Sequence, residues 1–273
     1  MQKVKLDAHR GYSAVYPENT LLAFREAMKL DIDMLEIDLH MTKDGEIIMM
    51  HDHTVDRTTN STGYIKDKTL AEMRALDAGS WKNAAFAGEK VPLFVEFLEL
   101  LKDDPHLEVC VELKDYPSTR EGNDAFVSCE KSIALIEEYG IADRVYINSW
   151  SGEILSYVAE RYGGKYRLHG YSPIGLNLDD FDRETYYGKL FCACLFEYRI
   201  IDGKRTNMQI PMTQEHFDRV KSYGVEPWVY FKQDTLENLK TAYERGAAGF
   251  TSNDPLLAGK LLDEIGARKL KKS

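Results

Sequence analysis

Eight short apolar runs, mostly separated by helical patterns, are the feature that most restricts how this chain can fold. The expected strands span residues 4–8, 34–38, 109–113, 145–149, 166–169, 191–196, 228–231 and 249–252. Helical patterns lie between most of them, over residues 21–30, 125–138, 153–162, 214–223 and 236–245. A glycine follows each of the last four patterns, as expected where a helix ends. Eight strand–helix units in about 250 residues predict an α/β fold of the TIM (β/α)8 barrel type.

The alternative for alternating strands and helices is an open, doubly wound parallel sheet. Such sheets usually carry a glycine-rich phosphate loop after the first strand, and none follows residue 8 here. We therefore expect one barrel domain over residues 1–273, with an insertion of about residues 52–104 after the second strand. The insertion contains a capping box, Thr69 to Glu72, and a short helical pattern over residues 94–101. Long loops at the carboxyl end of a barrel usually cover its active site, so we expect a lid.

Charged or ionisable pairs stand at or next to the ends of the early strand-like runs. These pairs are His9-Arg10, Glu36-x-Asp38, His51-Asp52 and Glu112-x-Lys114. Isolated charges at the ends of buried strands are costly unless they are paired or bind a ligand. Because the carboxyl ends of barrel strands converge on one mouth, we expect these side chains to meet there.

Asp44-Gly45, between two strand-like arms, is typical of a two-residue hairpin turn. With these two residues as the turn, Asp38 is expected to pair with His51. The hairpin would then return the chain so that His51 lies beside Glu36 and Asp38. The alternative is a plain surface hairpin that ends in an exposed histidine.

Three of these residues, Glu36, Asp38 and Glu112, are candidate ligands for a divalent metal. Residues two apart on a strand point to the same face, and three carboxylates meeting at the mouth would repel one another without a cation. Ligand sets made only of oxygen favour a hard ion, so the expected cofactor is Mg²⁺ or Ca²⁺. The alternative for a single carboxylate is a structural salt bridge with Arg10 or Lys114.

His9 and His51 are the candidate acid and base, because histidine titrates near neutral pH. Arg10 offers a planar fork suited to a phosphate, and Lys114 adds a second cation that can stabilise charge on phosphoryl oxygens. Aromatic residues such as Tyr230 at the ends of later strands are candidates for the pocket wall, although core packing also explains them. Together these residue types favour metal-assisted cleavage of a phosphate ester.

Composition restricts the partners and the setting. The net charge is −10, from 35 basic and 45 acidic residues, which argues against a broad nucleic-acid or anionic-membrane surface. We expect a small-molecule substrate, no nucleic acid and no stable membrane association; the sequence does not predict an oligomeric state. The four cysteines are expected to be core thiols, and no apolar stretch suits a signal peptide or a membrane span. A cytoplasmic setting is therefore expected, although a mature secreted chain would read the same.

Several motifs together resemble the glycerophosphodiester phosphodiesterase family. They are H-R-G with P-E-N-T-L-L-A-F, E-I-D-L-H-M-T-K-D-G-E-I-I-M-M-H-D, D-R-T-T-N-S-T-G, L-D-A-G-S-W, V-P-L-F and V-E-L-K. The resemblance implies a TIM barrel that hydrolyses glycerophosphodiesters to glycerol 3-phosphate and an alcohol. It implies His9 and His51 as acid–base residues and Arg10 and Lys114 as phosphate contacts. The same resemblance implies Glu36, Asp38 and Glu112 as metal ligands.

The second half of the chain departs from that family's pattern at two positions. Tyr230, in P-W-V-Y-F-K, stands about where the family often has a tryptophan, and is the candidate substrate-binding residue of the wall. Asn253, in T-S-N-D-P, replaces an acidic residue. These departures leave the preferred alcohol open, together with the choice between a cyclic phosphate intermediate and direct attack by water.

Three other functions remain as alternatives. A lysophospholipase D or sphingomyelinase D-like activity would use a similar barrel and site. A non-catalytic barrel that senses a phosphate ligand would have lost one of the histidines or carboxylates, and all are present. An amidohydrolase is disfavoured because the first strand ends in His-Arg and lacks a His-x-His metal pair.

Overall fold

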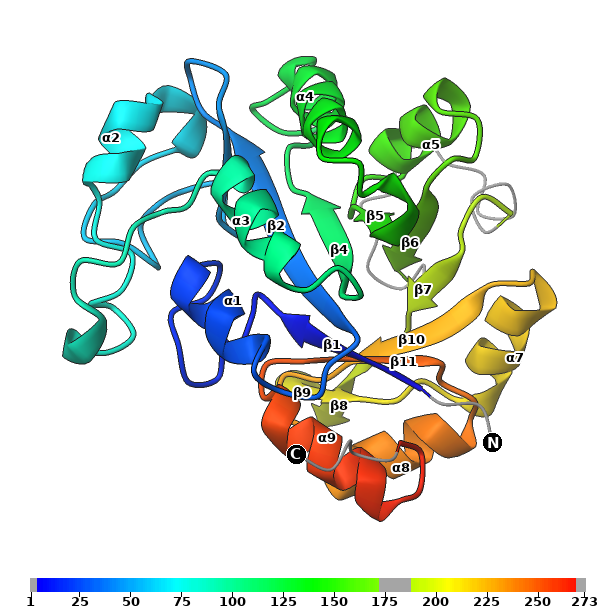
Figure 1. The fold of residues 1–273 in the computed structure, drawn as a ribbon. Helices are drawn as coiled ribbons and strands as arrows, with labels where there is room; N and C mark the ends of the chain where they lie inside the picture. Colours follow the sequence, from blue (N-terminus) through cyan, green and yellow to red (C-terminus); the bar gives the residue numbers. More distant parts are fainter. Residues whose placement is uncertain (1–3, 172–187, 269–273) are drawn as a thin grey trace.

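Eight parallel strands form a closed barrel in the computed structural model, which describes residues 4–171 and 188–268 (Figure 1). The barrel strands are β1 (Lys5–His9), β2 (Met34–Met41), β4 (Glu108–Leu113), β5 (Val145–Asn148), β6 (Arg167–Tyr171), β7 (Cys192–Cys194), β10 (Glu226–Tyr230) and β11 (Gly249–Ser252). β1 pairs in parallel with both β2 and β11, which closes the sheet on itself. The predicted barrel is therefore confirmed, and each of the eight expected runs contributes one strand.

Helices surround the strands, as expected for this architecture (Figure 1). Those that pack around the barrel are α1 (Leu21–Ala27), α3 (Phe94–Leu100), α4 (Asp124–Glu138), α5 (Gly152–Arg161), α7 (Gln214–Ser222), α8 (Leu236–Glu244) and α9 (Pro255–Glu264). Thr20 caps α1 by accepting a hydrogen bond from the Ala23 backbone N–H. The neighbouring Asn19 contacts Asp38 in the site described below.

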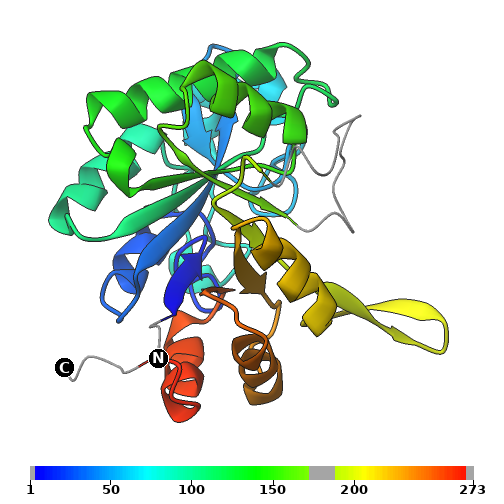
Figure 2. The same ribbon diagram turned by 90° about the vertical axis from the view of Figure 1, so that its right-hand side faces the viewer.

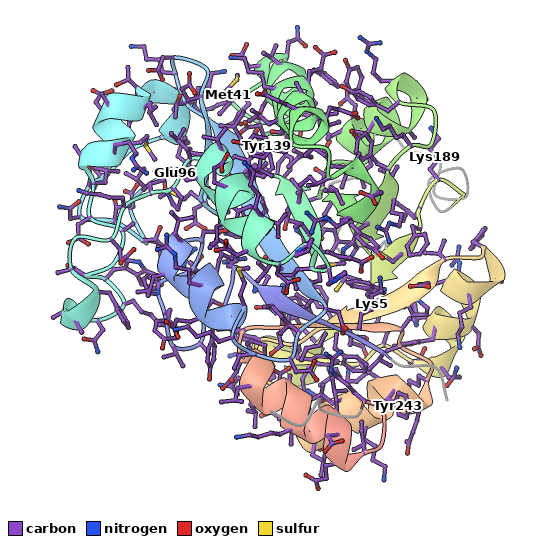
Figure 3. All side chains as sticks on the ribbon, viewed as in Figure 1. Lys5, Met41, Glu96, Tyr139, Lys189 and Tyr243 are labelled. Carbon is purple, nitrogen blue, oxygen red and sulfur yellow. The ribbon has the colours of Figure 1, made fainter. Side chains whose placement is uncertain are left out.

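The amino-terminal end of the barrel is closed by a charged cluster. Lys5, labelled in Figure 3, forms an ion pair with Glu108 and donates to the Tyr146 hydroxyl at 2.6 Å. Arg167 reaches the other Glu108 oxygen at 2.8 Å. These contacts satisfy the charges at that end, so the open end of the barrel is the carboxyl-terminal mouth.

The turn between β2 and β3 (Ile47–Met49) differs from the predicted one. Leu39 pairs with Met49 and Met41 with Ile47, so the loop is one residue longer than expected. Thr42 and Glu46 close it, and Gly45 has a positive φ of 87°, the arrangement of a three-residue loop with a bulge. The expected pairing of Asp38 with His51 is therefore wrong: the Asp38 carbonyl accepts from Met50, and His51 lies one residue further on.

The long segment between β3 and β4 consists of two parts. Its first part has a small apolar cluster of its own, separate from the main core and built on α2 (Leu70–Ala75) and its neighbours. Thr69 and Glu72 form the predicted capping box at the start of α2. α3 belongs to the main core, where Phe97 packs against Phe24 of α1 at a ring-centroid distance of 4.9 Å. The barrel thus resumes at α3, before the end of the expected insertion.

A second hairpin, absent from the expected elements, leaves the barrel after β7. Its strands are β8 (Glu197–Ile201) and β9 (Lys204–Ile210), which pair with each other in a separate two-stranded sheet. Figure 2 shows it as a yellow arm that extends away from the barrel. Among the described residues, no helix combines the length and apolar character needed to cross a membrane.

Candidate active site

The three predicted metal ligands meet at the mouth of the barrel. Glu36 and Asp38 lie on β2, and Asp38 stands in register with Glu112 of β4. One carboxylate oxygen from each residue lies within 4.8 Å of the others, and all three side chains are buried. The β2–β4 pairing thus produces the convergence that the sequence predicted.

Two oxygens of this triad have unused bonding capacity. Glu36 Oε1 and Asp38 Oδ1 are buried and have no hydrogen-bond partner, although Lys114 Nζ lies 3.8 Å from the latter. Burial, together with the neighbouring Asp38 and Glu112 carboxylates, raises the pKa of Glu36 well above its usual value. A hard divalent cation would relieve this repulsion and use these oxygens, so the donor set fits Mg²⁺ or Ca²⁺.

Asp38 is held ionised by its neighbours. Burial alone would raise its pKa, but the charges of Arg10, His51 and Lys114 outweigh burial and hold the pKa below the usual range. Arg10 Nε lies 3.0 Å from Asp38 Oδ2, and the Asn19 amide donates to the same oxygen at 2.7 Å. Asn19 is therefore a site residue that was not among the candidates from the sequence.

Glu112 is held from two sides. Lys114 Nζ donates to its Oε1 at 2.7 Å, and the Tyr171 hydroxyl donates to its Oε2 at 3.1 Å. Burial alone would lower the pKa of Lys114, but Glu112, Tyr116 and Asp38 together outweigh burial and raise it, which keeps the lysine charged. Lys114 is almost completely buried and is not among the residues that line the cavity described below. It contacts the carboxylate of Glu112, one of the three predicted metal ligands.

His9, at the end of β1, is oriented by a residue from the other end of the chain. Its Nδ1 lies 2.6 Å from Asn253 Oδ1, just after β11, and its Nε2 lies 3.9 Å from Glu36. The Tyr230 ring packs against the imidazole at a centroid distance of 4.5 Å, and the Tyr230 hydroxyl accepts from the Asn253 amide at 3.3 Å. Burial and the Arg10 charge lower the pKa of His9 to about 3. Both departures from the family's pattern therefore bear directly on this histidine.

His51 is supported by a chain of charged groups. Its Nδ1 lies 2.6 Å from Asp52 Oδ1, and Arg57 binds the other Asp52 oxygen at 2.7 Å. Arg57 also binds Glu18, which in turn accepts from Arg10 at 2.8 Å. This series of contacts connects the pair His9-Arg10 with the pair His51-Asp52 through Glu18 and Arg57. Neither Glu18 nor Arg57 was a candidate from the sequence.

A second histidine cluster holds the backbone of His51 in place. His40, buried on β2, lies with Nδ1 2.6 Å from Asp115 Oδ1 and with Nε2 3.3 Å from the His51 carbonyl oxygen. Asp115 also accepts from the Met41 backbone N–H at 2.9 Å. His40, His53 and Asp115 are close enough for a metal, but His40 and Asp115 already satisfy each other.

Arg10 pays a conformational cost for its position. It has a positive φ of 57°, which is unusual for a residue with a side chain. Its backbone N–H lies 2.9 Å from Glu36 Oε2 and 3.0 Å from the Glu36 carbonyl. Gly11 follows with φ of 79°, and a Cβ there would lie 2.7 Å from the Ala23 backbone. The H-R-G motif is therefore required by the tight path of the chain above the carboxylates.

A cavity of about 170 Å³ connects these groups. Asp7, His9, Arg10, Glu36, His51 and Glu112 line one side, and the other side carries Asn148, Trp150, His169, Tyr171, Cys194, Phe196, Tyr198, Gln209, Tyr230 and Thr251. One wall is thus charged and the opposite one is largely aromatic. Six of the eight predicted site residues line this cavity, and the other two, Asp38 and Lys114, lie behind it in contact with the lining residues Arg10 and Glu112.

Comparisons with known proteins show which family this chain resembles. The model of the glycerophosphoryl diester phosphodiesterase family matches residues 9–257. This chain belongs to that family. A glycerophosphodiester phosphodiesterase of Caldanaerobacter subterraneus subsp. tengcongensis is 43% identical over 253 residues, which cover 87% of this chain and 98% of the relative. One from Bacillus subtilis is 40% identical over 157 residues, covering 54% and 53% of the two chains. The protein is therefore a phosphodiester hydrolase.

Solved structures share the fold. A glycerophosphodiester phosphodiesterase from Agrobacterium tumefaciens aligns with a TM-score of 0.69 at 23% identity, covering 93% of this chain and 99% of its own. A phosphodiesterase from Oleispira antarctica, solved in complex with its product sn-glycerol-3-phosphate, aligns with a TM-score of 0.78 at 21% identity, covering 96% and 97%. These similarities support the barrel independently of the sequence motifs.

Proposed function

We propose that this protein is a metal-dependent hydrolase that cleaves glycerophosphodiesters to sn-glycerol 3-phosphate and an alcohol. The observation that carries the proposal is the position of the triad. Three carboxylates within 4.8 Å of one another stand beside two histidines that line the same cavity. Product binding by the Oleispira relative supports the same substrate class.

The divalent cation proposed here is Mg²⁺ or Ca²⁺, held by Glu36, Asp38 and Glu112. When bound, it would polarise a phosphoryl oxygen as a Lewis acid. Lys114 holds the Glu112 carboxylate in place through its contact at 2.7 Å, and Arg10 keeps Asp38 charged and in place. Arg10 also lines the cavity, so its guanidinium is the proposed phosphate contact. We propose that Lys114 affects the phosphate indirectly, by positioning the Glu112 carboxylate.

The two histidines are proposed to share the proton transfers. In His9 the Asn253 oxygen accepts the Nδ1 proton, which leaves Nε2 with a lone pair toward the carboxylates, as a base requires. The Asp52 carboxylate accepts a hydrogen bond from His51 Nδ1 and so orients the ring beside the cavity that His51 lines. We therefore propose His9 as the base toward the attacking oxygen and His51 as the acid toward the leaving alkoxide.

Release of glycerol 3-phosphate from glycerophosphocholine tests the proposal. The purified chain is assayed with Mg²⁺, with Ca²⁺ and with EDTA. We expect release with at least one metal and none with EDTA, and calorimetry should show weaker binding of that metal to Glu36→Gln than to the unchanged chain. Equal release with and without EDTA would contradict metal dependence, and no release under any condition would contradict the substrate class.

A lysophospholipase D-like activity is the second candidate. The aromatic wall of Trp150, Phe196, Tyr198 and Tyr230 favours it, because such a wall accepts an apolar substituent as readily as a choline group. Faster turnover of lysophosphatidylcholine than of glycerophosphocholine would support this second activity.

We also infer a reducing, cytoplasmic setting. The support is that all four cysteines are buried and unpaired, as is usual where thiols stay reduced. Cell fractionation with an antibody against the chain tests this inference.

A further inference from the structure

The outer part of the β8–β9 hairpin has no role in the chemistry described above. Asp202 and Gly203 form its two-residue turn with φ of 51° and 72°, the signs that a tight hairpin turn requires. Ile200 pairs with Arg205 and Ile201 with Lys204, and the hairpin extends away from the barrel (Figure 2). The turn therefore presents both pairs to solvent at the end of a protruding arm.

The outer part of this arm is both apolar and basic. Ile200 and Ile201 are 60% and 50% exposed, the highest values among the large apolar side chains of the described residues, and Met208 is 49% exposed. Residues 199–208 contain three basic side chains and one acidic one, in a chain whose net charge is −10. Isolated exposed apolar residues are ordinary, but three on one arm beside cations indicate a contact surface.

The inner part of the same arm belongs to the cavity. Tyr198 and Gln209 are paired across the hairpin, and both line the cavity. The Arg205 guanidinium lies over the Tyr198 ring at 3.5 Å, and Phe196 packs against both Tyr198 and Tyr230. A contact made by the arm is therefore made next to the entrance of the site.

We propose that the β8–β9 hairpin docks on the surface of an anionic phospholipid membrane. Isoleucine side chains suit the boundary between head groups and acyl chains, and the adjacent cations suit lipid phosphates. The five residues of β8 span roughly 17 Å, whereas charges are screened within about 8 Å in physiological salt. The acidic barrel therefore does not cancel the attraction of the arm. Such docking is reversible and agrees with the expectation of no stable association.

A second copy of the chain is the less suitable partner. Pairing of two hairpins would bring Arg199, Lys204 and Arg205 of each copy toward the same cations of the other, which opposes association. Docking on lipid also brings the cavity entrance to single-chain phosphodiesters in the membrane. That consequence rests on the proposed function, but the docking itself does not.

Sedimentation with vesicles tests the proposal. The full chain is mixed with vesicles of phosphatidylcholine alone or of equal parts phosphatidylcholine and phosphatidylglycerol. We expect binding to the second kind only, weakening with salt. The double variants Ile200→Asp/Ile201→Asp and Ile200→Ser/Ile201→Ser should each reduce binding roughly tenfold or more, the serine pair without added charge. The matched control Leu256→Asp/Leu257→Asp, on α9 with both leucines 41% exposed, should bind as the unchanged chain does.

Two results would overturn the proposal. One is the absence of binding by the unchanged chain to the phosphatidylglycerol vesicles, and the other is equal binding by the serine pair. Light scattering could give a third such result. If the unchanged chain forms an oligomer that does not bind vesicles, and the isoleucine variants break it up, the arm joins copies of the chain and does not dock on lipid. Hydrolysis of soluble glycerophosphocholine should be the same in all variants. It tests the proposed function separately and shows that each variant is folded.

Discussion

The two walls of the cavity differ in what holds them together. On the wall built by β1, β2 and β4, several polar groups are held by opposite charges, as in the contact of Arg10 with Asp38. On the opposite wall the contacts are between rings, such as Trp150 stacked on Tyr171 with centroids 3.7 Å apart. Charged contacts impose geometry strictly, whereas ring contacts tolerate changes of shape. We therefore expect the reaction to depend on the first wall and the choice of alcohol to depend on the second.

The largest expected effect is on the charged wall. His51→Ala and His9→Ala should each lower kcat for glycerophosphocholine by roughly 10²–10⁴-fold, the usual contribution of a positioned acid or base. Steady-state rates of glycerol 3-phosphate release at saturating metal provide the measurement. His106→Ala, at an exposed position, is the matched control. If kcat fell less than tenfold in both variants, the reaction would not depend on the charged wall as proposed.

A pH effect on stability is expected from Asp7, which lines the charged wall below the triad. Burial raises its pKa to about 7 from an ordinary value of 3.8, so the folded chain keeps a proton that the unfolded chain releases. Stability is therefore fully present below the ordinary pKa and is lost as the pH rises through about 7. At pH 8 without metal, Asp7→Asn should be more stable by at most about 4 kcal/mol.

Urea unfolding at pH 5 and pH 8 in EDTA tests this prediction. The advantage of Asp7→Asn should grow between the two values, while Asp103→Asn, at an exposed position, should show no such change. An advantage that is the same at both values would mean that the Asp7 carboxyl titrates normally.

A smaller effect is expected where the two walls meet, at Asn253. Asn253→Ala removes the oxygen that orients His9, so kcat should fall roughly tenfold, as for other losses of orientation, while KM changes little. Asn253→Asp keeps an acceptor at that place and should retain most of the activity. Equal loss in both variants would indicate that Asn253 only supports the fold.

The smallest effect is expected on the aromatic wall. Aromatic faces attract quaternary ammonium groups, so Trp150→Ala should lower the preference for glycerophosphocholine over glycerophosphoglycerol by about 3-fold. Trp150→Phe keeps a ring and should retain the preference. The measurement is kcat/KM for both substrates, and an equal fall for the two would contradict a selective wall.

The barrel and the triad were predictable because their signals are local. Strand runs can be read from short windows, and convergence at the mouth follows from parallel strands alone, as for Asp38 and Glu112. The contact of His9 with Asn253 was not predictable, because the two residues are 244 positions apart and meet only when β1 pairs with β11 to close the barrel. Glu18 and Arg57 are likewise joined by loops whose paths no periodicity indicates.

Two misses had a visible cause in the sequence. Asp44-Gly45 was assigned to a two-residue turn, whereas the Thr42 hydroxyl accepts from the Glu46 backbone N–H and favours the longer loop. Asp202-Gly203 carries the same hairpin signal between two strand-like arms, so β8 and β9 were open to prediction.

The contact between His9 and Asn253 also has a consequence for biosynthesis. A ribosome makes His9 244 residues before Asn253, so a nascent chain has its histidine before it has the group that orients it. Because β11 must pair with β1 to bring Asn253 into place, hydrolytic competence is acquired only after most of the chain has been translated. Prematurely terminated products without β11 would lack both a closed barrel and the group that orients His9, so we expect them to be inactive even if their first strands had already folded.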